Sequence, residues 1–393
     1  MPNRTASTSA LAGMTLVTVG SMTANAASYL LHLPASRFLG VEGYGEFASL
    51  LAAQLVLAVP ALALQSVVAR EVAHGRGTAE LRKLGYRCAG VVAILAFALA
   101  PVVAVVLGTG VLATASALVV APVLVLLATE QGLLQGSGQF GRLGAVLAAA
   151  GFGKVIPAVV VLTAGGGPGI VLAASAVGTA AVAVGARIAS VTREGDAVRL
   201  PLTVGTVLRA SQVQLALIGL SALDLVIAAA VLSAEQAGLY AIGAVATKAA
   251  FWLPQAVGVV LYPRMANPAE SAKAVRSALA VVAAIGAVLV LGAALAAPLL
   301  PSIVGEGYAP VQDYLWIFAL EGACLALLQS GLLWAIAGER TQLAIVAWVG
   351  LAVEVVLLFF VAATPLQFVI VAASVAAICA AVVSGFALGT SRN

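Results

Sequence analysis

Six charged side chains lie inside long apolar stretches of the sequence, where chemistry would be least expected. They are Glu130, Lys154, Asp224, Lys248, Glu321 and Glu354. A charge inside a bilayer costs a few kcal/mol and usually faces a cavity or an oppositely charged partner. The six residues therefore indicate either a charged binding cleft or internal ion pairs that hold helices together.

The two lysines and three of the carboxylates divide into two predicted roles. A lysine at mid-membrane suits a diphosphate as a point charge, and it can also pair with a carboxylate. We predict that Lys154 and Lys248 bind substrate and that Asp224, Glu321 and Glu354 bind a coupling proton or cation. The same three carboxylates are the candidate internal partners if Lys248 is structural instead.

Uncharged polar residues and one external cation complete the predicted site. Asn25 belongs to a polar stripe on the first apolar stretch, counted at 100° per residue. Gln54 lies on a polar face of the second stretch, and Gln255 shares a face with Lys248 in the eighth. Arg37 is added as a substrate contact, although a surface salt bridge is its simpler interpretation. Glu130 lies near the end of its stretch, where we expect its side chain to snorkel toward water.

Composition assigns these residues to a membrane protein. Hydrophobic residues make up 63% of the chain and charged residues 9%, whereas a soluble domain has about 25% charged residues. The net charge of +4 does not indicate nucleic-acid binding, because the basic residues flank apolar stretches, where they set topology. Three widely spaced cysteines, Cys88, Cys324 and Cys379, indicate neither a disulfide framework nor a metal cluster. No cofactor is predicted.

Twelve apolar stretches are long enough to cross a bilayer as helices, which takes about 20 residues. Strands would need alternating polarity and barrel closure, and these continuous apolar runs lack both. The predicted spans are roughly 10–33, 44–68, 86–107, 111–134, 143–164, 168–188, 206–231, 236–261, 275–300, 311–336, 342–362 and 366–388.

The basic residues orient these spans. Of the 19 Lys and Arg residues, Arg37 alone falls in a predicted external loop, and Lys154 and Lys248 lie within spans. The others lie on one side, which the positive-inside rule makes cytoplasmic. We therefore predict a multi-pass protein of the plasma or inner cell membrane with both termini in the cytoplasm.

An internal repeat divides the chain into two similar halves. The stretch Arg37–Arg70 opens with a predicted polar loop, residues 40–45, and returns in weaker form as Val231–Arg264. The shared Glu-x-x-Gly motif is Glu42–Gly45 in the first copy and Glu235–Gly238 in the second, and each copy carries an internal proline. Six helices per half make this a parallel repeat, as in two-lobed transporters. We predict an N-terminal lobe over residues 1–190, a cytoplasmic linker over 191–205 and a C-terminal lobe over 206–393.

The repeat resembles a known family. RFLGVEGYGEFASLLA (37–52), its echo LSAEQAGLYAIGAVA (232–246) and LLQGSGQFGRLG (133–144) are similar to motifs of polysaccharide flippases. These belong to the multidrug/oligosaccharidyl-lipid/polysaccharide (MOP) exporter superfamily, which includes MATE transporters. The resemblance implies an all-α, MATE-like fold and a carrier that moves undecaprenyl-diphosphate-linked sugars to the outer leaflet.

The resemblance and the residues together predict a transporter and not an enzyme. The predicted partners are a lipid-linked oligosaccharide, membrane lipids, a coupling proton or cation and other polysaccharide-assembly membrane proteins. A MATE-type drug–cation antiporter on the same fold is the alternative. A polytopic polysaccharide polymerase or glycosyltransferase ranks last, because the predicted external loops are short. The sequence has no P-loop, so we expect an ion gradient or the membrane potential to drive any uphill movement.

Cysteine labelling tests the predicted topology. Single cysteines placed at Gly166 and Gly307 should react with an impermeant reagent from outside, and those at Gly77 and Gly195 from inside. Reversed accessibility at any of the four positions would contradict the twelve-helix map.

Overall fold

The computed structural model describes residues 4–389 except 191–201, 255–256, 258–264, 266–270 and 338–339. Within that part of the chain all regular secondary structure is helical, and the helices form two compact units. The first unit holds residues up to Leu39 together with Ala53–Ser211, and the second holds Gly40–Ala52 together with the chain from Gln212 onward. The segment Gly40–Ala52 thus packs with the second unit, although the sequence places it in the N-terminal lobe.

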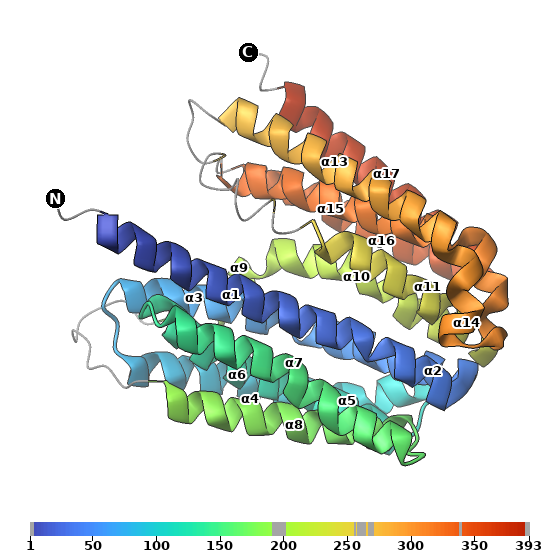
Figure 1. Cartoon of the computed structure of the whole chain (residues 1–393), viewed down its shortest axis with the longest axis horizontal. Helices are drawn as coiled ribbons and strands as arrows, with labels where there is room; N and C mark the ends of the chain where they lie inside the picture. The colour runs from blue at the N-terminus through green and yellow to red at the C-terminus, as the bar shows by residue number, and fades with distance from the viewer. Residues whose placement is uncertain are drawn as a thin grey trace. The chain divides into compact units, whose positions relative to one another are not determined.

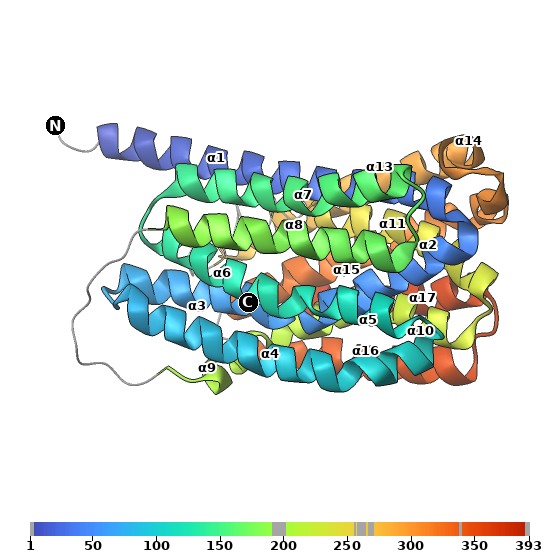
Figure 2. The same ribbon diagram turned by 90° about the horizontal axis from the view of Figure 1, so that it is seen from below.

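The first unit is built from long antiparallel helices (Figures 1 and 2). Within it, α1 packs on α7, α3 packs on α6, and α8 packs on both α6 and α7. Small residues allow these close approaches, since Gly20 meets the backbone of Gly144 and Gly151 meets Ala24. The helices are α1 (Arg4–Leu30), α2 (His32–Leu57, shared with the second unit), α3 (Val59–Ala73), α4 (Thr78–Leu107), α5 (Val111–Leu118), α6 (Val120–Gly136), α7 (Phe140–Thr163), α8 (Pro168–Ala189) and α9 (Val204–Ala210).

The second unit is organised around α15, which packs against α11, α13 and α17, while α10 packs on α16. Its core gathers buried side chains such as Leu217, Phe251, Leu325 and Val383. The helices are α10 (Gln212–Val231), α11 (Ala234–Trp252), α13 (Ser271–Ala296), η1 (Ala297–Leu299), α14 (Leu300–Val304), η2 (Glu306–Tyr314), α15 (Leu315–Ala337), η3 (Thr341–Leu343), α16 (Ala344–Phe360) and α17 (Pro365–Gly389).

The expected polar loop at residues 40–45 is wrong. The chain reverses instead at a single residue inside α2, Gly40, with φ 68° and ψ −178°. Glycine adopts a positive φ at little cost, so one residue is enough for the turn. The residues on either side of Gly40 remain helical.

The two copies of the Glu-x-x-Gly motif meet in the second unit. A Cβ added to Gly238 would lie 2.1 Å from the carbonyl oxygen of Val41, and one added to Gly45 would lie 2.9 Å from the amide nitrogen of Gly238. Tyr308 covers this crossing, because its ring packs edge-on to Tyr44 and its hydroxyl donates to the Gly40 carbonyl at 3.2 Å. At the glycines of the repeated motif the two backbones therefore lie so close together that there is no room for a side chain.

The described helices agree with the predicted crossings. Nine stretches are long and apolar enough to span a membrane, and the first, Thr15–Ala73, is long enough for two crossings that turn at Gly40. Two further helices lie where crossings were predicted, although neither is among those nine stretches: α16, which is apolar but shorter, and α11. Pro60 interrupts its crossing as predicted, since α2 ends and α3 begins just before it. α11 ends two residues before Pro254, and most of the chain from 255 to 270 lies outside the described residues.

Large apolar side chains cover the outer surface. Phe97, Leu295 and Phe360 each leave more than four fifths of their area exposed. Soluble proteins rarely expose contiguous apolar surface on this scale, so lipid must cover it.

The first unit closes at one end with a buried ion pair. The guanidinium of Arg82 donates two hydrogen bonds of 3.0 Å to the two carboxylate oxygens of Glu130. It also donates to the Ser190 hydroxyl at 2.8 Å, and that hydroxyl donates to Glu130. Both charged side chains are only 6% exposed. The expectation that the Glu130 side chain snorkels toward water is therefore wrong. The planar guanidinium of Arg82, on α4, forms hydrogen bonds with both of its carboxylate oxygens.

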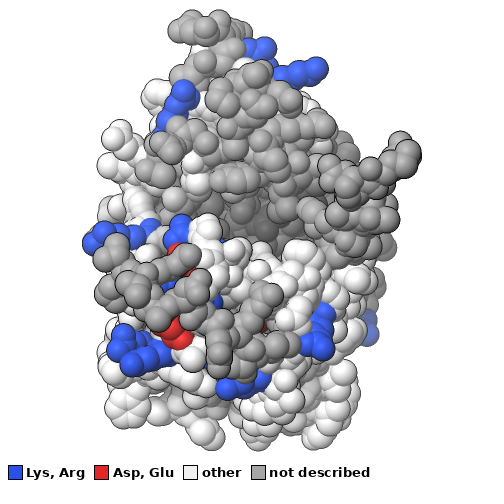
Figure 3. Space-filling view, turned by 90° about the vertical axis from the view of Figure 1, so that its left-hand side faces the viewer, with Lys and Arg blue, Asp and Glu red and all other residues white. Residues whose placement is uncertain are grey.

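Basic side chains gather at this end of the first unit, where α3, α6 and α8 finish (Figure 3). Arg76 is buried in the turn between α3 and α4, where it pairs with Glu71 at 3.1 Å and with Glu80. Arg142 reaches from α7 to the carbonyl of Ala189 at 3.2 Å. Several of the basic residues that we used to assign orientation thus also bind helix ends together.

Replacing Gly238 by valine should destabilise the fold, because the new side chain would collide with the Val41 carbonyl. Overpacking of this kind costs about 1–3 kcal/mol, so the apparent melting temperature in detergent should fall by several degrees. Gly292→Val is the matched control, because Gly292 lies in α13 with open space around it. Equal melting temperatures for the two variants would contradict the crossing.

Candidate functional site

Four of the predicted charged residues come together inside the second unit. Asp224 lies on α10, Lys248 on α11, Glu321 on α15 and Glu354 on α16. The three carboxyl side chains are at most 1% exposed, and Lys248 is half-buried. We call this set the carboxyl cluster, and it unites the three predicted ion-coupling residues with one predicted substrate contact.

Local sequence places α11 at the centre of the cluster. The helix begins with a capping box, in which Ser233 accepts from the Gln236 amide and the Gln236 side chain accepts from the Ser233 amide. Seven or eight residues make about two helical turns, so Tyr240, Thr247 and Lys248 share one side of α11. Because this side faces α10 and α15, a single helix supplies the cluster's hydroxyl and ammonium groups.

Aromatic packing fixes the tyrosine. The ring of Tyr240 is fully buried and packs edge-on against Phe318 of α15 and Phe368 of α17. Its hydroxyl donates to the Oδ2 atom of Asp224 at 2.5 Å. The Asp224 carboxyl is therefore held in one orientation by a residue that has little freedom to move.

The lysine and the remaining carboxyls interact at longer range. Thr247 donates to the Oε2 atom of Glu321 at 3.2 Å. Lys248 interacts electrostatically with both Asp224 and Glu321, and Glu354 interacts with the same two carboxyls. The four groups therefore form one electrostatic unit, in which the charge of each depends on the others.

The cluster holds more acids than it can neutralise. One oxygen of each acid, Asp224 Oδ1, Glu321 Oε1 and Glu354 Oε1, is buried and has no hydrogen-bond partner within the described part of the chain. Three carboxylates facing one ammonium leave excess negative charge, which is strongly disfavoured in a low-dielectric interior. A proton or a bound cation would relieve that excess.

The acids of the cluster do not form a ready-made metal site. No three His, Cys, Asp or Glu side chains converge on a common metal position within the described residues.

The predicted contacts in the first half lie elsewhere, in the first unit. Asn25 on α1 and Arg37 near the start of α2 are exposed, and Gln54 on α2 is buried. Lys154 on α7 is half-buried, and its backbone carbonyl accepts from the Ser175 hydroxyl at 3.1 Å. None of these four residues belongs to the carboxyl cluster. Gln255 lies outside the described residues.

Sequence reasoning missed the two residues that hydrogen-bond to acids of the cluster, Tyr240 and Thr247. Tyr240 lies eight residues before Lys248, on the same side of the helix, and this spacing was the available signal. A lone tyrosine and threonine in an apolar helix are ordinary core residues, so nothing in their type distinguished them.

The fold has close counterparts among solved structures, although no protein-family profile and no curated protein sequence matches the chain. A multidrug resistance MATE family transporter of the MOP superfamily, in an inward-facing conformation, aligns with a TM-score of 0.71 at 12% identity, covering 97% of this chain and 98% of the other.

Two further structures agree. A variant of the Vibrio cholerae MATE transporter VcmN aligns with a TM-score of 0.64 at 14% identity, covering 98% of this chain and 97% of the other. A MOP superfamily transporter from Pyrococcus furiosus aligns with a TM-score of 0.62 at 13% identity, covering 97% of this chain and 96% of the other. The fold is thus that of MATE-like transporters, as predicted: an all-α, polytopic membrane protein.

A double-mutant cycle tests whether Lys248 is held by the acids around it. Lys248→Met removes the counter-charge from a buried cluster, a change that costs about 3–5 kcal/mol for a buried pair. The melting temperature should therefore fall, and adding Asp224→Asn should restore part of the loss. Strictly additive effects of the two substitutions would show that the residues do not interact.

Proposed function

We propose that the protein is a membrane transporter that flips undecaprenyl-diphosphate-linked oligosaccharide from the inner to the outer leaflet. Movement proceeds by alternating access, and the product feeds cell-surface polysaccharide synthesis. The MATE-like fold supports a transporter of this superfamily, and the three flippase-like motifs support the lipid-linked substrate. The protein acts in the plasma or inner membrane with both termini in the cytoplasm.

The observation that carries this proposal is the meeting of the two motif copies. Gly45 and Gly238 lie in two of the three flippase-like stretches, and at these glycines the two copies make backbone contact. The contact gives the repeated Glu-x-x-Gly motif a structural role, and this supports the resemblance that includes it.

The carboxyl cluster is the proposed coupling site. Protonation of Asp224, Glu321 or Glu354 would change the charge facing Lys248, and a lysine released from its acids is able to attract a diphosphate. The proposed substrate contacts are Lys248 with Asn25, Arg37, Gln54, Lys154 and Gln255. Neighbouring polysaccharide-assembly proteins would supply the substrate and remove the product.

A drug–cation antiporter is the second candidate. The neighbour with a TM-score of 0.71 is a multidrug resistance transporter, and a cluster rich in acids suits the exchange of a cation for a proton. The same cluster would then bind the organic cation directly, with no role for a diphosphate.

A reconstituted assay separates the two candidates. In liposomes, the purified protein should expose a fluorescent polyprenyl-diphosphate oligosaccharide to an external sugar-modifying enzyme, whereas protein-free liposomes should not. Lys248→Gln should reduce the initial rate about tenfold or more, and Lys248→Arg should retain part of it. Lys273→Gln, at an exposed position on α13, is the control and should leave the rate unchanged.

The antiporter arm uses the same liposomes with a fluorescent organic cation inside and an imposed pH gradient. We expect no gradient-driven efflux of the dye. Efflux that requires Glu321, combined with no exposure of the lipid-linked sugar, would replace the proposal by the second candidate.

A further inference from the structure

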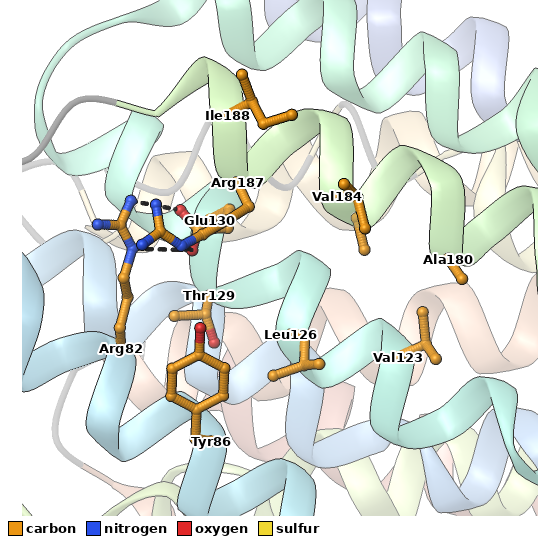
Figure 4. A pocket seen from close by; sticks show the side chains of 11 residues that line it. Arg82, Tyr86, Val123, Leu126, Thr129, Glu130, Ala180, Val184, Arg187 and Ile188 are labelled. Atoms are coloured by element: carbon orange, nitrogen blue, oxygen red, sulfur yellow. Dashed lines mark hydrogen bonds and ion pairs between the residues drawn. The ribbon is translucent and has the colours of Figure 1, made fainter.

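The first unit carries a groove that the proposed transport does not use. It has a volume of about 300 Å³ and lies between α4, α6 and α8. Apolar side chains line most of its length, among them Val123, Leu126 and Val184, and a polar group closes one end (Figure 4). Val184 and Ile188 leave 61% and 80% of their areas exposed, so the groove opens on the apolar outer surface of the unit.

The polar end of the groove carries a net positive charge. Arg82 and Arg187 converge there on the single carboxylate of Glu130 (Figure 4). Arg82 satisfies that carboxylate with two hydrogen bonds of 3.0 Å, whereas Arg187 stands 3.7 Å from it and is 48% exposed. Two guanidiniums and one carboxylate leave one positive charge in excess, carried on the side that opens outward.

We propose that this groove binds one anionic phospholipid of the surrounding bilayer. An acyl chain lies along Val123, Leu126 and Val184, and the phosphate is held by the guanidinium of Arg187 with the hydroxyl of Tyr86 beside it. A phosphodiester carries one negative charge, which matches the excess positive charge, and guanidinium is the side chain best shaped for phosphate. The site is separate from the carboxyl cluster and does not depend on the proposed transport.

Size and position favour a lipid over the other anions present. A volume of 300 Å³ is at the lower end for ligand sites, enough for part of one acyl chain but not for an oligosaccharide with its diphosphate. Soluble phosphate would leave the apolar length of the groove unfilled. The groove also lies at the end of the unit that is rich in basic residues, predicted to be cytoplasmic, and anionic lipids concentrate in the cytoplasmic leaflet.

Bound lipid would tie three helices together. The groove is framed by α4, α6 and α8, and Ser190, just after α8, already bonds to Arg82. A ligand that binds only the folded protein raises its stability by an amount that grows with the logarithm of the free ligand concentration relative to the Kd. The lipid should therefore stabilise the full-length protein in detergent.

The test compares lipids of matched acyl chains on the purified full-length protein. Phosphatidylglycerol should raise the melting temperature and remain bound in native mass spectrometry, with an affinity at least about fivefold above phosphatidylcholine, the ratio that one kcal/mol per basic contact gives. Arg187→Gln should remove that fivefold preference. Val184→Trp, a substitution at an exposed position, should fill the groove and weaken both lipids.

Two controls make the result decisive. Arg142→Gln removes an exposed arginine at the same end of the unit but outside the groove, and it should keep the preference for phosphatidylglycerol. Inorganic phosphate alone should give no stabilisation. Equal affinity for the two lipids, or an unchanged preference in Arg187→Gln, would overturn the proposal, as would stabilisation by phosphate matching that by phosphatidylglycerol.

Discussion

Charge inside a bilayer is tolerated only with a partner, and this constraint organises both units. Within the described residues, Glu130, Asp224 and Glu321 each lie next to a basic or hydroxyl group. Glu354 lies close to Asp224 and Glu321. The two units meet the constraint in different ways. In the first unit, the guanidinium of Arg82 donates one hydrogen bond to each carboxylate oxygen of Glu130. The second gathers three acids around one lysine and leaves an oxygen on each without a hydrogen-bond partner among the described residues.

That contrast has a chemical consequence. A bidentate pair with arginine occupies both carboxylate oxygens and joins two helices. Acids that outnumber the cations beside them interact with one another as a single electrostatic unit. The structure therefore separates an ion pair that holds helices in the first unit from a set of mutually interacting acids in the second. The ring of Tyr240 packs against Phe318 and Phe368, and its hydroxyl holds the Asp224 carboxyl of that set in place.

The sequence predicted the architecture well because hydropathy and the positive-inside bias are averages over many residues. The helical class, the crossings and the break at Pro60 all followed from such averages.

The turn at Gly40 did not, because a one-residue reversal looks in sequence like one more glycine in a polar stretch. The pairing of Glu130 with Arg82 was missed for a related reason. The partners are 48 residues apart, and nothing in either helix alone identifies the other. The acids of the carboxyl cluster were found because charge in an apolar run is conspicuous, whereas Tyr240 and Thr247 have types that ordinary cores also use.

The motif that signalled the repeat shows why short similarities carry information in apolar proteins. In a helix made mostly of alanine, valine and leucine, one apolar residue replaces another at small cost. A glycine whose missing side chain leaves 2.1 Å to a facing carbonyl, as at Gly238, has no substitute. The sequence is thus constrained most tightly where backbones touch and where charge is buried, and these are the two kinds of position from which a function was inferred. The apolar residues between these positions set the length of each membrane-spanning helix and its orientation in the bilayer, and many sequences meet that requirement. A fold match at 12% identity is therefore compatible with a different substrate.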